Sequence, residues 1–310
     1  MASIVTKKIK EKDYLYLVES VREGSKVKQK TVKYIGRKRP VSKEEFECME
    51  YSRKEKDWVL NEFKDELSYQ DHNEMKVSSD KNKESLVSLD EVSKEKMKEK
   101  FLSTFISNSS AIEGSTLTVN ETFNYLFEDV VPEGHSKKEL FMVSNILDAW
   151  NYMEKRCDKL PTKEDLCVLH KIVNKGIESD STLGQYKKVQ NYIGEVYTTS
   201  YLFVDNKMDQ LLEWIKHSNS KINNFETAFQ SHAQFEIIHP FVDGNGRVGR
   251  LLLNWLLMYK NLSPLAIHFN KRREYISALE NSRRGKVEAI CLFMRDEYLE
   301  MYEFKEFILI

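Results

Sequence analysis

The chain has 310 residues, of which 41% are hydrophobic, 11% aromatic and 31% charged, with five prolines. These values favour a soluble, helix-rich protein of one large or two modest domains with ample material for a core. No apolar run approaches the roughly 18 residues of a membrane span, and the start lacks the apolar core of a signal peptide, so we expect a cytoplasmic location without membrane contact. The four cysteines are scattered without metal-ligand spacing, which predicts reduced thiols.

Charge is distributed unevenly, although the net charge is −1. Residues 1–40 hold 12 Lys and Arg against 4 Asp and Glu, a balance of +8, so the other 270 residues carry −9. A basic segment on an acidic body indicates, mildly, that residues 1–40 contact a partner of the protein.

Residues 1–40 are expected to form a small basic β-hairpin module. β-rich segments at 14–18 and 26–34 flank a turn at 23–25, and lysines alternate along the second segment. Such lysines can follow nucleic-acid phosphates, or they can keep an edge strand soluble. We favour the edge strand, because no aromatic–arginine pattern along the segment supports base stacking. The segment also faintly resembles the short basic stretches that begin some transposases, from which we infer nothing.

Residues 41–90 are expected to be a helical and charged linker region. A helix over 42–70 would begin at Ser42 as its N-cap, with Glu45 completing a capping box. Lys, Glu, Asp and Ser dominate the residues after this helix, which predicts a linker over 71–90.

The main domain is expected at 91–300, followed by a tail at 301–310. Helical patterns occupy 91–108, 120–128, 137–155, 162–177, 207–219, 225–238, 272–281 and 286–310. Asp205 is a predicted N-cap, and His170 is interpreted as a packed or solvated side chain. Residues 184–204 instead have β character and predict a second hairpin, with arms around 189–193 and 197–204.

One predicted helix ends with a recognisable pattern. Ser109 and Glu113 are four residues apart, so they share a helix face, and Gly114 is a natural C-cap. A serine, a glutamate and a glycine end many helices, so this segment by itself indicates no function.

Residues 239–250, HPFVDGNGRVGR, combine groups that suit phosphate chemistry. Gly244 and Gly246 allow the loop to curl its N–H groups around an anion, and the next helix directs its N-terminus to the same place. Arg247 and Arg250 are three residues apart, so on a helix they can reach one polyphosphate.

Two more side chains of this run could take part in catalysis. Asp243 could hold the divalent cation that accompanies a nucleotide, and His239 could accept a proton from an attacking hydroxyl. A polar turn whose histidine caps the preceding helix is the simpler interpretation of these residues alone. The helix at 248–258 is apolar almost all round, so we expect it to be buried and to anchor the loop.

The full run resembles the signature of the Fic family, in which His, Phe, an acid, Gly-Asn-Gly, Arg and a second Arg recur at this spacing. All of these residues are present here, which makes coincidence a poor alternative. The resemblance covers roughly residues 100–300. It implies a mainly α fold, the Fic helical bundle, with a β-hairpin flap and the basic hairpin before it.

The resemblance implies an enzyme, a nucleotidyltransferase that moves AMP from ATP to a Ser, Thr or Tyr hydroxyl of a target protein. His239 would be the general base, Asp243 would hold Mg²⁺ and Phe241 would pack to fix the loop. The implied nucleotide-binding residues are Gly244, Asn245, Gly246, Arg247, Arg250 and, by a weaker match that a core position explains equally well, Tyr275.

Residues 109–114 then resemble the inhibitory motif of the family: Ser or Thr, three residues, Glu, then Gly or Asn. In relatives with this motif the glutamate pairs with the second arginine of the signature and blocks the γ-phosphate. The matching residues here are Glu113, preceded by Ser109, and Arg250. The resemblance therefore implies a protein that is inhibited by its own N-terminal helix.

The resemblance also implies how a target protein is held. The hairpin at 184–204 would be the flap, which pins an extended target segment by strand addition. Lys187 stands where the family often has an arginine. Modification of the chain itself is expected.

Other activities remain open. The same scaffold in relatives transfers other phosphate-containing groups, and an inhibitory glutamate can serve in removing AMP from a target. From a different class, the chain could be a nucleic-acid or partner-binding adaptor that uses its N-terminal hairpin. The intact signature argues against an adaptor as the sole role.

Overall fold

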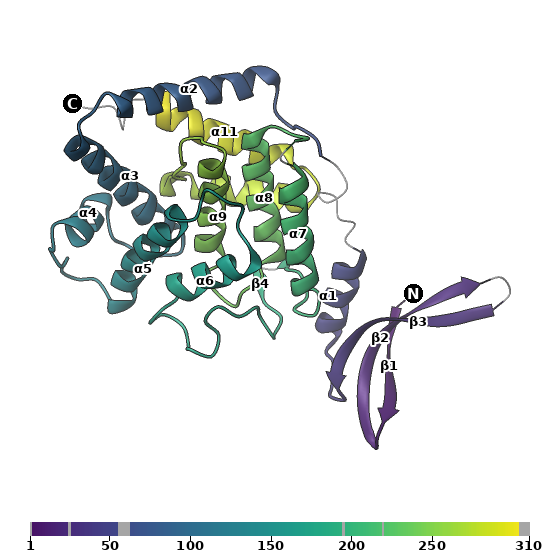
Figure 1. The fold of residues 1–310 in the computed structure, drawn as a ribbon. Coiled ribbons are helices and arrows are strands. Elements are labelled where there is room, and N and C mark those ends of the chain that lie inside the picture. Colours follow the sequence, from purple (N-terminus) through teal and green to yellow (C-terminus); the bar gives the residue numbers. More distant parts are fainter. Residues whose placement is uncertain (1, 24–25, 55–62, 194–195, 219, 304–310) are drawn as a thin grey trace.

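The computed structural model describes residues 2–23, 26–54, 63–193, 196–218 and 220–303 (Figure 1). This part of the chain is mainly helical, as predicted, with a small sheet that extends from one side of the helical body. Within it, none of the helices combines the length and the apolar character that crossing a membrane requires.

The N-terminal sheet is antiparallel and has the strand order β1-β2-β3. Its strands are β1 (Ala2–Ile9), β2 (Lys12–Glu23) and β3 (Lys26–Arg37). The predicted hairpin corresponds to β2 and β3, and residues 24–25 of its turn lie outside the described residues. The sequence analysis did not predict β1, because its apolar residues do not alternate cleanly with polar ones.

The sheet packs on helix α1 (Lys43–Lys54), whose predicted N-cap is present: the Ser42 hydroxyl accepts a hydrogen bond from the Glu45 amide at 3.1 Å. The Glu45 carboxylate, which was expected to complete a capping box, is bonded to Arg39 and Tyr201 instead. A small core joins Leu15, Leu17 and Ile35 of the sheet to Met49 of α1. Two side chains that follow the second hairpin of the chain, Leu202 and Phe203, pack against this core.

Helix α1 is also hydrogen-bonded to the main body. The Cys48 thiol donates to the Thr198 carbonyl at 3.4 Å, and the Ser200 amide donates to the Ser52 hydroxyl at 2.8 Å. The N-terminal sheet is therefore attached to the body beside the second hairpin, and its far end extends away from the helices (Figure 1).

The expectation of a linker over residues 71–90 is wrong, because α2 (Tyr69–Val87) occupies most of it. Ser68 and Asp71 form a reciprocal capping box at its start. His72, Met75 and Ser79 are buried at helical spacing, and a polar outer surface conceals this narrow buried stripe in the sequence. Of the helix predicted over 42–70, residues 55–62 lie outside the described residues and 63–67 are not helical.

The helices of the main body agree with the predicted segments to within a few residues. They are α3 (Glu91–Ile112), α4 (Val119–Phe127), α5 (Lys137–Glu154), α6 (Lys163–Val173), α7 (Val204–Ser218), α8 (Asn224–Ile238), α9 (Asn245–Tyr259), α10 (Arg272–Arg283) and α11 (Glu288–Glu303), with a 3-10 turn, η1 (Phe269–Lys271), before α10. Asp205 is not an N-cap, since α7 already begins at Val204. Helix α11 continues to Glu303, into the expected tail, and residues 304–310 of the predicted helix and tail lie outside the described residues.

Helix α9 occupies the centre of the body and contacts α3, α5, α6 and α8 (Figure 1). Leu251, Leu252 and Leu253 are consecutive and all fully buried, so α9 is enclosed on every side, as its apolar sequence predicted. The residues at the N-terminus of α9 are thus attached to a helix that is enclosed by the core.

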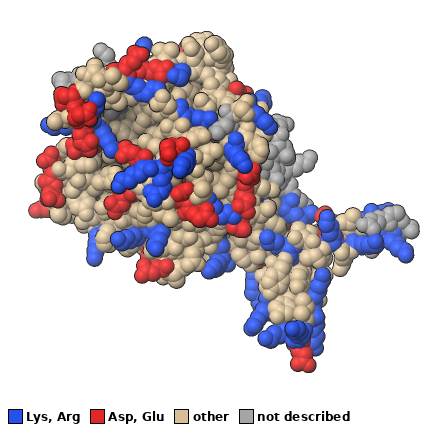
Figure 2. All heavy atoms as spheres, in the orientation of Figure 1, with Lys and Arg blue, Asp and Glu red and all other residues tan. Residues whose placement is uncertain are grey.

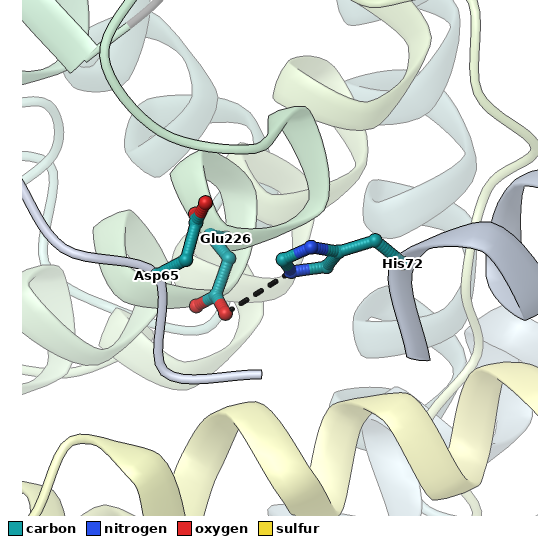
Figure 3. Close-up of side chains that lie close together, drawn as sticks. All are labelled: Asp65, His72 and Glu226. Carbon is teal, nitrogen blue, oxygen red and sulfur yellow. Dashed lines mark hydrogen bonds and ion pairs between the residues drawn. The ribbon is translucent and has the colours of Figure 1, made fainter. Parts of the chain in front are cut away.

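A buried carboxylate holds the segment before α2 against α8. Glu226 Oε1 accepts hydrogen bonds from the amides of Glu66 and Leu67 at 2.9 and 2.7 Å, and it lies 3.3 Å from His72 Nε2 (Figure 3). Asp65, His72 and Glu226 have potential ligand atoms within 4.8 Å of one another. Two backbone N–H donors already occupy Glu226 Oε1, which is the oxygen nearest His72. We therefore interpret this cluster as a structural contact between the segment before α2 and α8, and not as a metal site.

Candidate active site

The loop between α8 and α9 adopts a backbone that only certain residues allow. Gly244 is the N-cap of α9 and has φ +73°. A Cβ atom at this position would lie 2.3 Å from Asn174 Nδ2, so glycine is needed for space as well as for conformation. His239 also adopts a left-handed conformation, with φ 51°, where it ends α8.

Asn245 and Phe241 fix the shape of the loop. The Asn245 side chain accepts a hydrogen bond from the Phe241 amide at 2.8 Å and donates one to the Phe241 carbonyl at 3.0 Å. The Phe241 ring is fully buried and stacks on His170 at 3.9 Å. The Asn245 side chain is therefore committed to the loop, which leaves only its backbone amide for the predicted phosphate contact.

Two side chains of α6 and its C-cap hold the same loop, and the sequence analysis missed this role. His170 Nδ1 accepts from the Gly184 amide at 2.9 Å, so its Nε2 carries the proton and donates to the Asp243 carbonyl at 3.1 Å. Asn174 Nδ2 donates to the same carbonyl at 3.3 Å. His170 is packed, as expected, but its contacts position the loop. Nothing at positions 170 and 174 reveals this in the sequence.

The N-terminus of α9 forms an electropositive pocket. Gly244 has no side chain to cap the helix, so the first amides of α9 are oriented toward any bound anion. Arg247 is buried and donates to the Val173 carbonyl at 3.1 Å and to Asn174 Oδ1 at 2.8 Å. Its guanidinium thereby places a fixed positive charge behind these amides.

Asp243 is oriented toward solvent at the edge of this pocket, with 55% of its side chain exposed. One carboxylate oxygen accepts from the Gly244 amide at 2.7 Å, and the other lies 3.8 Å from Arg247. A single accessible carboxylate beside a helix N-terminus fits Mg²⁺, which typically binds one or two carboxylates together with substrate phosphates.

His239 lies at the wall of the site, and its Nδ1 is 3.9 Å from Glu236 Oε2. Burial, together with the positive charges of Lys187 and Arg283, lowers the pKa of His239 to about 3. The imidazole is therefore neutral at neutral pH and has a lone pair available to accept a proton.

The sequence analysis also missed Glu236, which lies one helical turn before His239 and is only 6% exposed. Burial raises the pKa of its carboxyl to about 7. Among the described residues, its Oε1 has no hydrogen-bond partner. An acid three residues before the histidine was the only sequence signal, and many surface helices carry the same spacing.

Arg250, on the second turn of α9, is bound to the end of α3. Its Nε donates to the Ser109 hydroxyl, and its Nη2 donates to both the Ser109 carbonyl and Glu113 Oε1, each at 2.9 Å. Arg250 is 1% exposed, whereas the Glu113 side chain is 31% exposed. The residue pair that the resemblance implied is thus an ion pair in the structure.

Glu113 also extends over the start of α9. A Cβ atom on Gly246 would lie 2.2 Å from Glu113 Oε1, so this glycine allows the carboxylate to approach the helix. Glu113, Arg250, Glu236 and His239 all line one cavity of about 190 Å³. Ligand pockets usually span about 300–1,000 Å³, so the cavity as it stands is small for a whole nucleotide.

Tyr275 lines the same cavity, but its hydroxyl lies 2.7 Å from His232 Nε2 and its ring is 1% exposed. It therefore serves as a wall of the cavity and belongs to the core as well. Arg272, which was not a predicted site residue, also lines the cavity and donates to the Ile112 carbonyl at 2.9 Å.

The second hairpin lies beside the loop but is shorter than predicted. Its described strands are β4 (Tyr192–Ile193) and β5 (Val196–Tyr197), and the chain then turns into α7. Lys187 bonds the signature loop through its backbone, from its amide to the Pro240 carbonyl at 2.9 Å. Burial lowers the pKa of its amine to about 7, and the amine donates to Asn191 and Thr198.

Comparisons with known proteins agree with this geometry. Residues 159–257 match the model of the Fic/DOC family, and residues 3–56 match that of the IS1634 family transposase N-terminal domain. Protein adenylyltransferase Fic of Nematostella vectensis is 28% identical over 193 residues, which are 61% of this chain and 45% of that protein. Protein adenylyltransferase fic-1 of Caenorhabditis elegans is 27% identical over 196 residues, 61% of this chain and 38% of that protein. The chain thus spans less than half the length of these relatives.

Solved structures have the same fold. Fic-1 (residues 134–508) from C. elegans superposes with a TM-score of 0.67 at 22% identity, covering 76% of this chain and 71% of that one. A Fic domain containing signaling protein from Bacteroides thetaiotaomicron also has a TM-score of 0.67, at 20% identity, and covers 75% and 95%. The helical body is therefore a Fic fold, and the predicted fold class is confirmed.

The raised pKa of Glu236 predicts how stability depends on pH. Between about pH 4.5 and pH 7 the unfolded carboxyl loses its proton while the folded one keeps it, so the wild type loses up to about 3 kcal/mol over this window. Glu236→Gln lacks this loss, and its advantage over the wild type grows with pH. Urea unfolding at several pH values measures the difference, with the exposed Glu95→Gln as control; parallel curves for wild type and Glu236→Gln contradict the prediction.

Proposed function

We propose, on the premise that residues 159–257 form a Fic/DOC domain, that this protein is an adenylyltransferase that transfers AMP from ATP to a hydroxyl side chain of a target protein. The observation that carries the proposal is the junction of α8 and α9. There, the neutral imidazole of His239, Gly246 at the start of α9 and the buried Arg250 line one cavity. The buried Arg247 and the exposed Asp243 carboxylate belong to the same loop and first helical turn. The names of the relatives support the same activity.

In the proposed reaction the target hydroxyl oxygen attacks the α-phosphorus of ATP in line. The new P–O bond forms as the bond to the bridging oxygen of the β-phosphate breaks, and pyrophosphate leaves. His239 accepts the hydroxyl proton. Its Nδ1 is buried, so Nε2 is the nitrogen assigned to this step.

The remaining groups position and stabilise the phosphates. The amides of Asn245 and Gly246 and the fixed charge of Arg247 oppose the negative charge that develops on them, whereas the Gly244 amide is already bonded to Asp243. Asp243 is the residue assigned to hold Mg²⁺, which would neutralise phosphate charge when bound. Because these groups are attached to α9, they need little reorganisation during the reaction.

We propose that Glu113 keeps this site inactive. Arg250 is the cation that would contact the γ-phosphate, and its Nη2 is held at 2.9 Å by Glu113 and by the Ser109 carbonyl. A γ-phosphate and the Glu113 carboxylate, both anionic, would compete for one guanidinium. Movement of Glu113 away from Gly246 would free Arg250 and enlarge the cavity.

The β4–β5 hairpin is the proposed binding site for the target segment, through main-chain strand addition. A hairpin of this kind accepts many sequences, so modification of the chain itself is expected as well. Transfer of another phosphate-containing group, or removal of AMP from a target, remains an alternative on the same scaffold. Covalent labelling of protein by α-labelled ATP distinguishes AMP transfer from both.

His239→Ala is expected to abolish labelling of the protein by α-labelled ATP with Mg²⁺, because it removes the neutral imidazole that is assigned to take the hydroxyl proton. General-base removal typically costs about 10²–10⁴-fold in rate. The exposed His217→Ala is the matched control and should label like the wild type. Activity that survives in a folded His239→Ala protein would remove this histidine from the role of base.

Glu113→Gly is expected to increase the same labelling by about tenfold or more, since it releases Arg250 for the γ-phosphate. Glu113 is the C-cap of α3, so the matched control is Glu128→Gly at the C-cap of α4. Unchanged labelling in Glu113→Gly would contradict autoinhibition. Labelling by UTP or CTP without labelling by ATP would contradict the nucleotide assignment.

A further inference from the structure

The two sides of the N-terminal sheet have different surroundings. Residues that pair directly across antiparallel strands point to the same side. One side carries Leu15 and Leu17, which are buried against α1. The pairing of Tyr14 with Arg37, Tyr16 with Tyr34, and Lys7 with Tyr14 places these five residues together on the other side, which we name the tyrosine face.

The rings of the tyrosine face form one cluster. The centroid of Tyr34 lies 5.3 Å from that of Tyr16 and 6.0 Å from that of Tyr14, and Tyr34 is 48% exposed. Lys7 Nζ lies 4.8 Å above the Tyr16 ring and donates to the Thr31 hydroxyl. No single strand carries an aromatic–arginine pattern, so the sequence did not predict this cluster. Strand pairing brings tyrosines of β2 and β3 together with cations of β1 and β3.

The electrostatic surroundings of the tyrosine face are strongly positive. Residues 1–40 carry +8, while the rest of the chain carries −9. Lysines and arginines line the margins of the part of the sheet that extends from the body (Figure 2). A polyanion would therefore be attracted to this sheet more than to the rest of the chain, whose net charge is negative.

Lysines that keep an edge strand soluble explain the charge on β3 but not the tyrosine cluster. An exposed tyrosine ring, Tyr34, beside two partly buried ones and flanked by cations matches one ligand chemistry well, since bases stack on rings while phosphates pair with lysines and arginines. A duplex hides the faces of its bases, so the matching ligand is a single strand.

We propose that the tyrosine face binds single-stranded nucleic acid. Tyr16 and Tyr34 are the stacking platform, and Lys7 and Arg37 contact the phosphates. This binding is independent of nucleotide transfer at the α8–α9 junction. Because α1 attaches the sheet beside residues 197–203, a bound strand lies on the side of the protein that carries the β4–β5 hairpin.

Fluorescence anisotropy of the full chain with labelled single strands of about 20 nucleotides, oligo(dT) and oligo(U), tests the proposal. Either strand should bind in low salt, and its affinity should fall as salt is raised. Tighter binding of oligo(dT) would identify DNA as the ligand, and tighter binding of oligo(U) would identify RNA. A labelled duplex that binds most tightly, a poly-glutamate peptide that binds instead, or no binding at low salt would overturn the proposal.

Variants separate stacking from charge. Tyr34→Leu keeps an apolar side chain but lacks the ring, and it should weaken binding about tenfold, whereas Tyr34→Phe should bind like the wild type. The exposed Tyr69→Leu on α2 is the matched control. Lys7→Glu with Arg37→Glu should flatten the salt dependence, and the same charge change at Lys81 and Lys96 should not. Thermal unfolding establishes that each variant is folded. A folded Tyr34→Leu protein that binds the single strand as tightly as the wild type would overturn the proposal that bases stack on Tyr34.

Discussion

The buried guanidinium of Arg250 is the constraint on which the arrangement of the site depends. Arg250 lies on the central helix α9, enclosed by apolar side chains, and a charge in such a place must be paired. The end of α3 supplies the partners, a carboxylate from Glu113 and two oxygens from Ser109. The same ion pair joins two helices and, in the proposed function, holds the guanidinium that a terminal phosphate would contact.

The remaining site residues are held in place by contacts around the start of this central helix. Phe241 and Asn245 close the loop, and His170 and Asn174 fix the Asp243 carbonyl, so the amides of α9 are oriented before any ligand arrives. Glu236 and His239 are buried in the same wall, which keeps the imidazole neutral and the carboxyl readily protonated. The loop and the start of α9 are thus held in place by their own contacts, and in the proposed function Glu113 is the group that moves.

Most helices and the signature residues of the site were predictable from local sequence patterns. The features that depend on tertiary packing were not. The signature residues 239–250 and the Ser109–Glu113 spacing indicated the site through their resemblance to the signature and inhibitory motif of the Fic family, whereas either pattern alone had a simpler structural interpretation. The supporting roles of His170, Asn174 and Glu236 had no local pattern, since they depend on which helices meet. Helix α2 was missed because three buried residues on a polar helix give a weak period. The tyrosine face was missed because strand register is invisible until the strands are paired.

The central claim is that Glu113 and a γ-phosphate compete for Arg250. Calorimetric binding of ATP and of ADP to the wild type and to Glu113→Gln tests it most directly, because ADP lacks the competing phosphate and glutamine keeps the shape without the charge. The account predicts that Glu113→Gln gains about tenfold in affinity for ATP and little for ADP. An equal gain for both nucleotides, or none for ATP, would contradict it.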